Sequence, residues 1–212
     1  MAKFLCGGVI AALLLAAPAC AETWRDTVTA FVDANLRHPA WGASHSRRDY
    51  ALAKQMAAQD GVALDDDVLF AAAFLHDMSA FPAWSVKDQD HADAAAGKID
   101  LVLGDTDFPK AKLDAVRAAI RTHMYGRDPV APEARFLHDA DALDWLGAIG
   151  VARQFANAPA ASEAVRQIQT LMVRVPPRVV TPAGKARLPS LLEEDKAFLD
   201  ALKRESGAWA DL

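Results

Sequence analysis

The stretch Phe74-Leu75-His76-Asp77-Met78 places a His-Asp pair at the end of an apolar, alanine-rich segment, residues 68–75. A segment of this composition is typical of a helix that is buried on all sides. Its end can hold an imidazole and a carboxylate inside the protein, where both groups need a partner. The usual partner is a divalent metal, because imidazole nitrogen and carboxylate oxygen both bind it. The metal hypothesis therefore requires further His and Asp side chains on other buried helices.

The first 21 residues have the pattern of a cleaved secretory signal. One positive charge precedes an uncharged apolar run over residues 4–17, and Ala19-Cys20-Ala21 supplies small residues at the cleavage site. We expect the mature chain to begin at Glu22 and to be secreted across the inner membrane into the periplasm. The alternatives are a membrane anchor, for which the apolar run is short, and lipid attachment through Cys20. Cleavage removes both cysteines, so the mature chain would depend on its core alone.

The remaining residues, 22–212, are expected to form a single domain, because a chain of this length buries most of its apolar surface. The chain has 23 basic and 28 acidic residues. This balance argues against a general binder of duplex nucleic acid or of anionic membranes, whose surface would be basic. We expect a small-molecule partner and no stable membrane insertion, and the sequence leaves the oligomeric state open.

The chain shows helical spacing throughout and no sustained strand alternation, which predicts an all-α fold. The loop at 78–88 directly follows the His-Asp pair, and such loops often shape the mouth of a site. A second, proline-rich loop is expected at 174–189, with a role that the sequence leaves open. The expected helices cover residues 22–36, 44–59, 65–76, 91–103, 109–124, 132–155, 162–173 and 191–203.

Further candidate ligands lie on the inward faces of these helices. His45 shares a face with Leu52 and Met56, and His123 ends a helix whose apolar positions recur at three- and four-residue steps. Asp141 lies four residues from both Leu137 and Trp145, so its carboxylate should be buried and either paired or metal-bound. The fourth helix opens with a further histidine, His91.

Each of these residues also has a structural interpretation. An inward His at a helix end often binds a backbone carbonyl, and His91 could be an exposed cap residue. Asp139 and Asp144 could be surface acids or ion-pair partners of Arg135 and Arg153. The metal interpretation is favoured because His, His-Asp, His, His and Asp recur on separate helical segments.

At this point the chain resembles the HD-domain metal-dependent phosphohydrolases. Their pattern of a first His, a His-Asp dyad and a later Asp matches His45, His76, Asp77 and Asp141. The segment Asp139-Ala140-Asp141-Ala142-Leu143-Asp144-Trp145-Leu146-Gly147-Ala148-Ile149-Gly150-Val151-Ala152-Arg153 is similar to a bacterial subgroup called YedJ-like. Thr181-Pro182-Ala183-Gly184-Lys185-Ala186 is similar to the C-terminal segment of that subgroup. The chain departs from the family in its secretory signal and in lacking Gly-Lys after the dyad.

The resemblance implies an HD-domain helical bundle over 22–212, with a C-terminal helical extension and a metal site between core helices. It implies that His45, His76, Asp77 and Asp141 bind one metal, and that His91 and His123 bind a second metal or the substrate phosphate. Mixed nitrogen and oxygen ligation suits Mn, Fe, Co, Ni, Zn or Mg, one or two ions per chain.

This ligand set suits hydrolysis of a phosphomonoester or phosphodiester, with a nucleotide as one substrate. Asp77 would bridge metals or orient the attacking water, and Arg48, one turn from His45, is the first candidate for a phosphate contact. Lys87 and the basic residues of the 174–189 loop, including Lys185, are weaker candidates. Two alternatives remain: a di-iron oxygenase that uses both His91 and His123, and a non-catalytic metal-binding or sensing protein.

Overall fold

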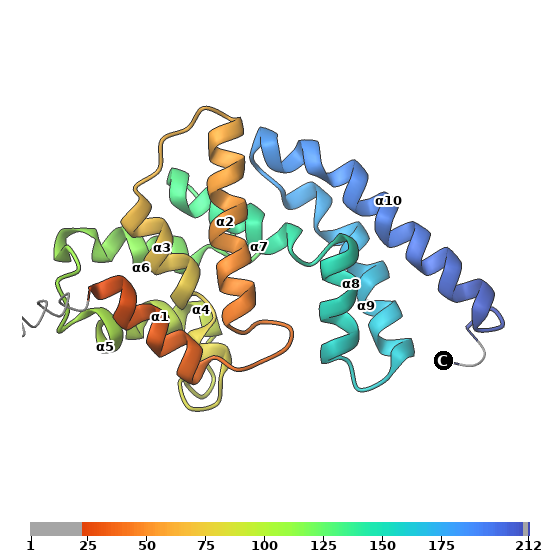
Figure 1. Ribbon diagram of the computed structural model, residues 1–212, viewed down its shortest axis with the longest axis horizontal. Coiled ribbons are helices and arrows are strands. Elements are labelled where there is room, and N and C mark those ends of the chain that lie inside the picture. Colours follow the sequence, from red (N-terminus) through yellow and green to blue (C-terminus); the bar gives the residue numbers. More distant parts are fainter. Residues whose placement is uncertain (1–22, 210–211) are drawn as a thin grey trace, which may run out of the picture.

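The computed structural model describes residues 23–209 and 212, and Figure 1 labels the α-helices of this part of the chain. The regular elements of residues 23–209 are all helical, which confirms the all-α fold. The predicted signal, residues 1–21, lies outside the described residues. The elements are α1 (Trp24–Asn35), α2 (Ala43–Gln59), α3 (Asp66–Leu75), η1 (Met78–Ala80), α4 (His91–Lys98), α5 (Asp100–Leu103), η2 (Lys110–Lys112), α6 (Leu113–Arg121), α7 (Pro132–Leu143), α8 (Gly147–Asn157), α9 (Ala161–Arg174), η3 (Pro176–Arg178) and α10 (Pro182–Glu205).

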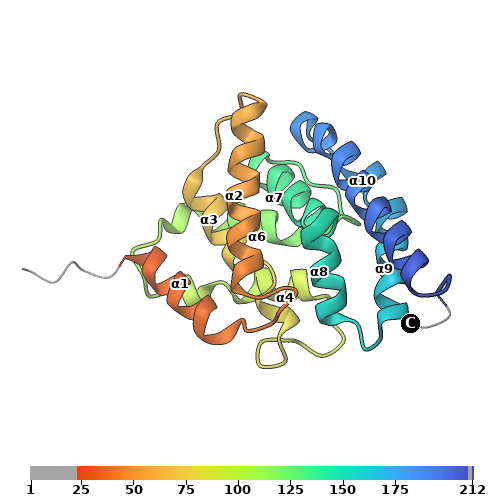
Figure 2. The ribbon, with the colours of Figure 1, turned by 45° about the vertical axis from the view of Figure 1, so that its right-hand side comes forward.

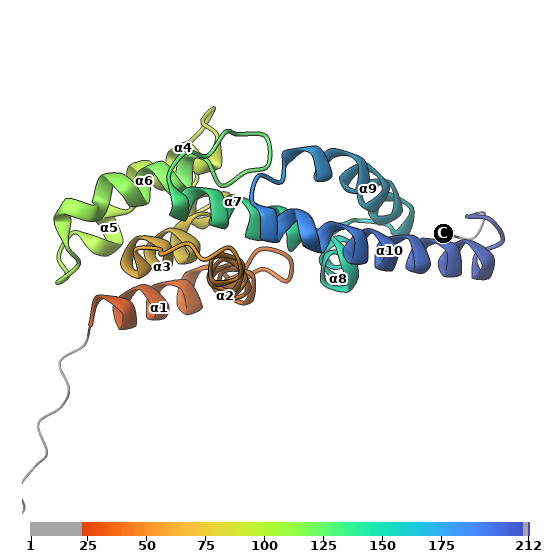
Figure 3. The same cartoon turned by 90° about the horizontal axis from the view of Figure 1, so that it is seen from above.

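Helices α2 and α7 lie side by side in the middle of the molecule and connect its two ends (Figure 2). Helices α1 and α3–α6 form one end, and α8, α9 and α10 form the other (Figure 3). Helix α7 packs against α2, α3 and α6 on one side and against α10 on the other. Among the described residues, no helix combines the length and the apolar character that crossing a membrane requires.

Helix α3 is the buried segment that the sequence predicts. The Asp65 side chain accepts hydrogen bonds from the backbone N–H groups of Asp67 and Val68, which caps the first turn. All residues from Val68 to Leu75 are buried, so the helix is enclosed on every side. The helix ends at His76, and the His-Asp pair therefore emerges inside the protein.

The predicted helix at 132–155 is wrong in one respect, because it is two helices with a turn between them. Helix α7 ends at Leu143, and α8 begins at Gly147. Gly147 has φ +66, a left-handed conformation that favours glycine and interrupts a right-handed helix. The turn places Asp144 at the end of α7, where its carboxylate can face back toward α2.

The predicted loop at 174–189 is also wrong. It contains η3 and the first two turns of α10, so the last helix begins at Pro182 rather than at residue 191. The Thr181 hydroxyl accepts a hydrogen bond from the Gly184 N–H, and Pro182 fits the first turn, where no N–H is needed. Pro189 lies inside α10. It has no backbone N–H, so the helix lacks one hydrogen bond there but continues past it.

The remaining predicted helices are present with shifted or interrupted ends. The segment at 91–103 is divided at Ile99 into α4 and α5, and the segment at 109–124 is η2 followed by α6, which ends at Arg121. The loop at 78–88 starts with the single turn of η1. These ends follow local backbone geometry, which hydrophobic periodicity predicts less well than it predicts the helices themselves.

The start of α10 is tied to α7 by a buried carboxylate. Asp139 accepts hydrogen bonds from the N–H groups of Val180 and Thr181 and from the Thr181 hydroxyl, at 2.6–3.2 Å. Gly184 lies so close to this contact that an added Cβ would be 2.7 Å from Asp139 Oδ2 and 2.8 Å from Thr181 Oγ1. The close packing of α10 on α7 therefore requires glycine at residue 184, because any side chain there would clash with Asp139 and Thr181.

We expect Gly184→Ala to lower the free energy of unfolding by about 1–3 kcal/mol, because the methyl group overpacks the Asp139 contact. Gly97→Ala is the matched control: it lies in α4, and its added Cβ has no neighbour within 4 Å. It should be neutral or stabilise the protein by up to about 1 kcal/mol through helix propensity. Urea unfolding of both variants measures the difference, and equal effects would contradict the proposed close contact.

Candidate metal centre

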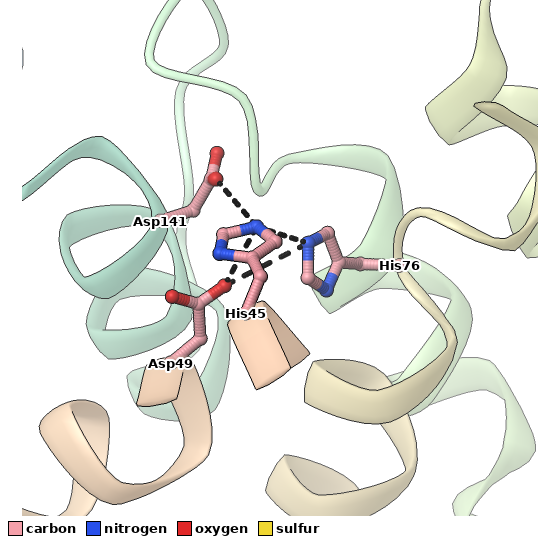
Figure 4. Close-up of side chains that lie close together, drawn as sticks. All are labelled: His45, Asp49, His76 and Asp141. Carbon is pink, nitrogen blue, oxygen red and sulfur yellow. Dashed lines mark hydrogen bonds and ion pairs between the residues drawn. The ribbon is translucent and has the colours of Figure 1, made fainter. Parts of the chain in front are cut away.

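Most of the buried His and Asp side chains of the site come from three central helices, and His123 follows α6. Helix α2 carries His45 and, one turn later, Asp49; the end of α3 carries His76 and Asp77; and α7 carries Asp141. Figure 4 shows His45, Asp49, His76 and Asp141 converging, with the His45 ring in the middle. Because α2 packs against both α3 and α7, residues about 95 positions apart in the sequence share one small buried volume.

Four of these residues form the first group of possible metal ligands, called group 1 here: His45, Asp49, His76 and Asp141. The Nε2 atom of His45 lies 3.2 Å from His76 Nε2, 3.1 Å from Asp49 Oδ2 and 3.3 Å from Asp141 Oδ1. One proton on His45 Nε2 can serve only one of these three neighbours. A cation among the four side chains would satisfy all of them, so group 1 has the chemistry of a divalent metal site.

A second group, group 2, consists of His76, Asp77 and His123. Asp77 faces both groups, because its Oδ2 lies 3.3 Å from His76 Nε2 and 3.6 Å from His45 Nε2. Its Oδ1 lies 3.4 Å from His91 Nε2 and 3.7 Å from His123 Nε2. His76 and Asp77 thus place the two groups side by side, and His91 stands at the edge of group 2.

Three buried imidazoles are oriented in the same way. Each Nδ1 atom lies at hydrogen-bond distance from an oxygen. His45 bonds Asp144 Oδ2 at 2.8 Å, His76 bonds the Ala73 carbonyl at 2.9 Å, and His123 bonds the Ile120 carbonyl at 2.6 Å. An Nδ1–H bonded to an oxygen leaves the lone pair on Nε2, and metal-binding histidines are commonly held in this manner. All three Nε2 atoms face the buried carboxylates.

The buried polar atoms without a partner support the metal interpretation. Both carboxylate oxygens of Asp49 and the Nε2 atom of His123 accept no hydrogen bond, although they are fully buried. Most buried polar atoms in proteins are paired, and an unpaired carboxylate is costly. The residues present therefore fit a bound divalent cation.

Electrostatic interactions shift the acid–base equilibria of the cluster in different directions. Burial, together with the nearby charges of Asp144 and Asp141, raises the pKa of Asp49 well above its ordinary value. Burial also acts to raise the pKa of Asp141, but its contact with His45 and the charges of the neighbouring imidazoles lower it to about 2. Burial and the charge of His76 lower the pKa of His123 to about 4, so its ring is neutral at pH 7 and its Nε2 can bind a cation.

Asp144 holds His45 in place from outside the cluster. Its carboxylate accepts hydrogen bonds from His45 Nδ1, from Arg153 Nη1 at 2.8 Å, and from Nε and Nη2 of Arg48, both at 2.8 Å. From the sequence, Asp144 could be a surface acid or an ion-pair partner. The structure shows the ion pair with Arg153. Arg48, which the sequence predicts as a phosphate contact, binds Asp144 through two of its guanidinium nitrogens.

A cavity of about 280 Å³ opens beside the cluster. Asp77, Asp141 and His91 line this cavity, so a molecule bound in it would contact both groups of possible ligands. His38 stacks on the Trp41 ring at 3.6 Å, and the Arg153 guanidinium lies 3.5 Å from the Trp145 ring centre, which fixes both indoles. The cavity is lined by Trp41, Asp77, Ala80, His91, Met124, Tyr125, Asp141 and Trp145.

The structure brings most of the predicted site residues together. His45, His76 and Asp141 meet in group 1, whereas Asp77 stands in group 2 with His123, and His91 lies beside it. Lys87 and Lys185 are exposed and do not line the cavity. Sequence reasoning missed Asp49, although its four-residue step from His45 places both side chains on one helix face.

We expect Asp144→Asn to weaken metal binding roughly 10- to 100-fold, the usual effect of losing a carboxylate that orients a ligating histidine. Titration calorimetry with Mn²⁺ measures the change. Asp33→Asn is the control, because Asp33 forms an exposed ion pair with Arg47. An Asp144→Asn variant that binds Mn²⁺ as tightly as the wild type would show that Asp144 does not orient the site.

Comparison with known proteins shows which family has a similar sequence over the region of this site. The family model of the HD domain matches residues 42–146, the segment from the start of α2 to the turn after α7. A search of curated proteins found no significant match.

Several solved structures share the fold at low sequence identity. A protein from Lactobacillus plantarum is 20% identical, with a TM-score of 0.69, over 90% of this chain and 100% of its own. A predicted HD superfamily hydrolase from an uncultured Thermotogales bacterium is 23% identical, with a TM-score of 0.59, over 86% of this chain and 91% of its own. Bacillus subtilis YpgQ in complex with ADP is 20% identical, with a TM-score of 0.66, over 85% and 97% of the two chains.

The matched segment contains His45, His76, Asp77 and Asp141, the four residues that the sequence resemblance implies as ligands of one metal. Residues 42–146 are an HD domain, and the chain belongs to the HD superfamily.

Proposed function

We propose that the chain is a metal-dependent phosphohydrolase that cleaves a phosphomonoester or a phosphodiester. The observation that carries this proposal is the position of Asp77 and Asp141, which belong to the His/Asp groups and also line the cavity. A substrate in the cavity would therefore contact the metal centre directly. Membership of the HD superfamily supports hydrolytic chemistry at such a centre.

The catalytic roles follow from the placement of the side chains. A divalent ion bound here would lower the pKa of a bound water and neutralise charge on the phosphoryl group. Asp77 faces group 1 through Oδ2 and His91 through Oδ1, so it can orient a water between the groups and the cavity. Its hydrogen bond raises the pKa of His91, whose protonated ring would donate a proton to the leaving oxygen.

The charge of the cavity wall constrains how a phosphate is bound. Among the residues that the structure describes, the cavity is lined by two carboxylates and by no Lys or Arg side chain. The sequence-based candidates Arg48, Lys87 and Lys185 all lie outside this lining. The negative charge of a phosphate would therefore be met by the metal and by His91, and not by a cluster of basic residues.

A nucleotide is the substrate class that the cavity suits best. Three aromatic side chains, Trp41, Tyr125 and Trp145, line it and could stack against a planar base. Bacillus subtilis YpgQ, a protein of similar fold, has been crystallised with ADP. Together these observations make nucleoside phosphates the first substrates to test.

We also propose that the mature chain acts in the periplasm and belongs to the YedJ-like subgroup. The support is the predicted signal over residues 1–21 and the similarity of the segments at 139–153 and 181–186. Activity in a periplasmic extract of the native host that disappears on deletion of residues 2–21 would support the location.

The hydrolase proposal is tested with the purified protein, generic phosphate esters and nucleoside phosphates. We expect hydrolysis that EDTA removes, that added Mn²⁺ or Co²⁺ restores, and that Asp77→Asn lowers more than about 100-fold through loss of a metal contact. Asp88→Asn, an exposed control in the following loop, should keep full activity. Metal binding without hydrolysis of any ester would favour the non-catalytic, sensing alternative.

The nucleotide proposal is tested with Trp41→Ala. Loss of one base-stacking contact is expected to cost about 1–3 kcal/mol, which raises KM for a nucleotide roughly 5- to 150-fold. The KM for glycerol phosphate, which has no ring, should be unchanged. Trp84→Ala is the matched control, because Trp84 packs against Phe31 and does not line the cavity. Equal effects on both substrates would contradict base stacking.

A di-iron oxygenase is the second candidate, and one observation favours it. His123 and His91 both approach Asp77 Oδ1, so group 2 could hold a second ion. Iron-dependent oxygen uptake in the absence of any ester hydrolysis would replace the phosphohydrolase proposal with this one.

A further inference from the structure

The Asp49 carboxylate is fully enclosed and lacks a conventional partner. The residue is 0% exposed, and neither carboxylate oxygen accepts a hydrogen bond from residues 23–209 or 212. Burial of such a group is unfavourable unless a positive charge or several donors compensate it. The guanidinium groups of Arg48 and Arg153 are both already bound to Asp144. The compensating charge must therefore come from elsewhere.

The groups that face Asp49 are themselves metal-binding atoms. Its Oδ2 lies 3.1 Å from His45 Nε2 and 3.7 Å from His76 Nε2. Both rings use Nδ1 to bond an oxygen on their far side, so Nε2 presents a lone pair to Asp49 in each neutral ring. Two lone pairs and a carboxylate repel one another in the absence of a cation. Figure 4 shows Asp49 directed at this point from one side and Asp141 from another.

A proton on His45 is the competing explanation. A protonated His45 could donate from Nε2 to Asp49, but the same atom also faces Asp141 Oδ1 at 3.3 Å and His76 Nε2 at 3.2 Å. One proton leaves two of these three contacts unsatisfied. A cation, which can bind several ligands at once, accounts for the whole arrangement.

We propose that Asp49 is a metal ligand of this chain, additional to the four residues that the family resemblance implies. Asp49 stands in group 1 with His45, His76 and Asp141, whereas Asp77 stands in group 2. The inference rests on the metal-binding part of the proposed function and not on hydrolysis. A second carboxylate makes group 1 richer in oxygen, which shifts its preference toward hard ions such as Mn²⁺ and Mg²⁺ and away from Ni²⁺.

The experiment measures metal binding and thermal stability of the full mature chain without substrate. We expect Asp49→Asn to weaken Mn²⁺ binding at least about tenfold and Ni²⁺ binding less, since imidazole ligands suit Ni²⁺. In EDTA the variant should melt at a higher temperature than the wild type, because the cost of enclosing an acidic group beside Asp141 is removed. With saturating Mn²⁺ the order should reverse, because the variant gains less stability from the metal.

Asp195→Asn is the matched control. Asp195 is another buried carboxylate, 1% exposed, but it lies in α10 and in neither group of possible ligands. Its effect on the melting temperature should be the same with EDTA and with Mn²⁺, and its Mn²⁺ affinity should equal that of the wild type. Asp49→Ala, checked for helix content by circular dichroism, serves as the second variant if the Asn variant does not fold.

The outcomes separate this inference from the proposed function. Wild-type affinity for Mn²⁺ in both Asp49 variants would overturn the ligand role and leave the hydrolase proposal standing, and it would favour the protonated His45. Weakened Mn²⁺ binding in these variants, in a protein that hydrolyses no ester, would support Asp49 as a ligand and reject the hydrolase.

Discussion

The shared orientation of three buried imidazoles is the constraint on which the site depends. His45, His76 and His123 each bond an oxygen through Nδ1 and direct Nε2 toward buried carboxylates. Without a cation this arrangement sets lone pairs and negative charge against one another, which opposes folding. The packing of α2, α3, α6 and α7 nevertheless holds these side chains together. A bound metal would relieve the repulsion, so metal binding would stabilise the folded core.

The fold follows largely from hydrophobic periodicity, because burial of α3 on every side leaves a continuous apolar run that the sequence shows directly. The two errors arise where local geometry overrides periodicity. Gly147 adopts a left-handed conformation inside a helical pattern, and the Thr181 cap starts a helix inside a proline-rich stretch. A cap and a positive φ are single-residue events, and a pattern averaged over several turns does not detect them.

The site was predictable where ligands lie in helices with clear inward faces. His45, His76 and Asp141 are of this kind, and the structure brings them within contact distance. Asp49 was missed because an acid between Arg48 and Tyr50 reads as a surface residue until α7 covers that face of α2. The ion pair of Arg48 was not foreseen because its partner Asp144 is 96 residues away and reaches it only through the turn that ends α7.

Because the wall of the cavity is acidic, the metal in the proposed reaction would be needed for substrate binding as well as for catalysis. Asp77 and Asp141 would repel a phosphate, and within the described part of the chain no Lys or Arg side chain lines the cavity to offset them. Bound cations reverse the sign of the local charge, so an anionic substrate would bind well only after the metal. By thermodynamic reciprocity the substrate must then tighten metal binding by the same factor. Asp49 strengthens this coupling, because each added carboxylate makes the site without metal more repulsive to phosphate.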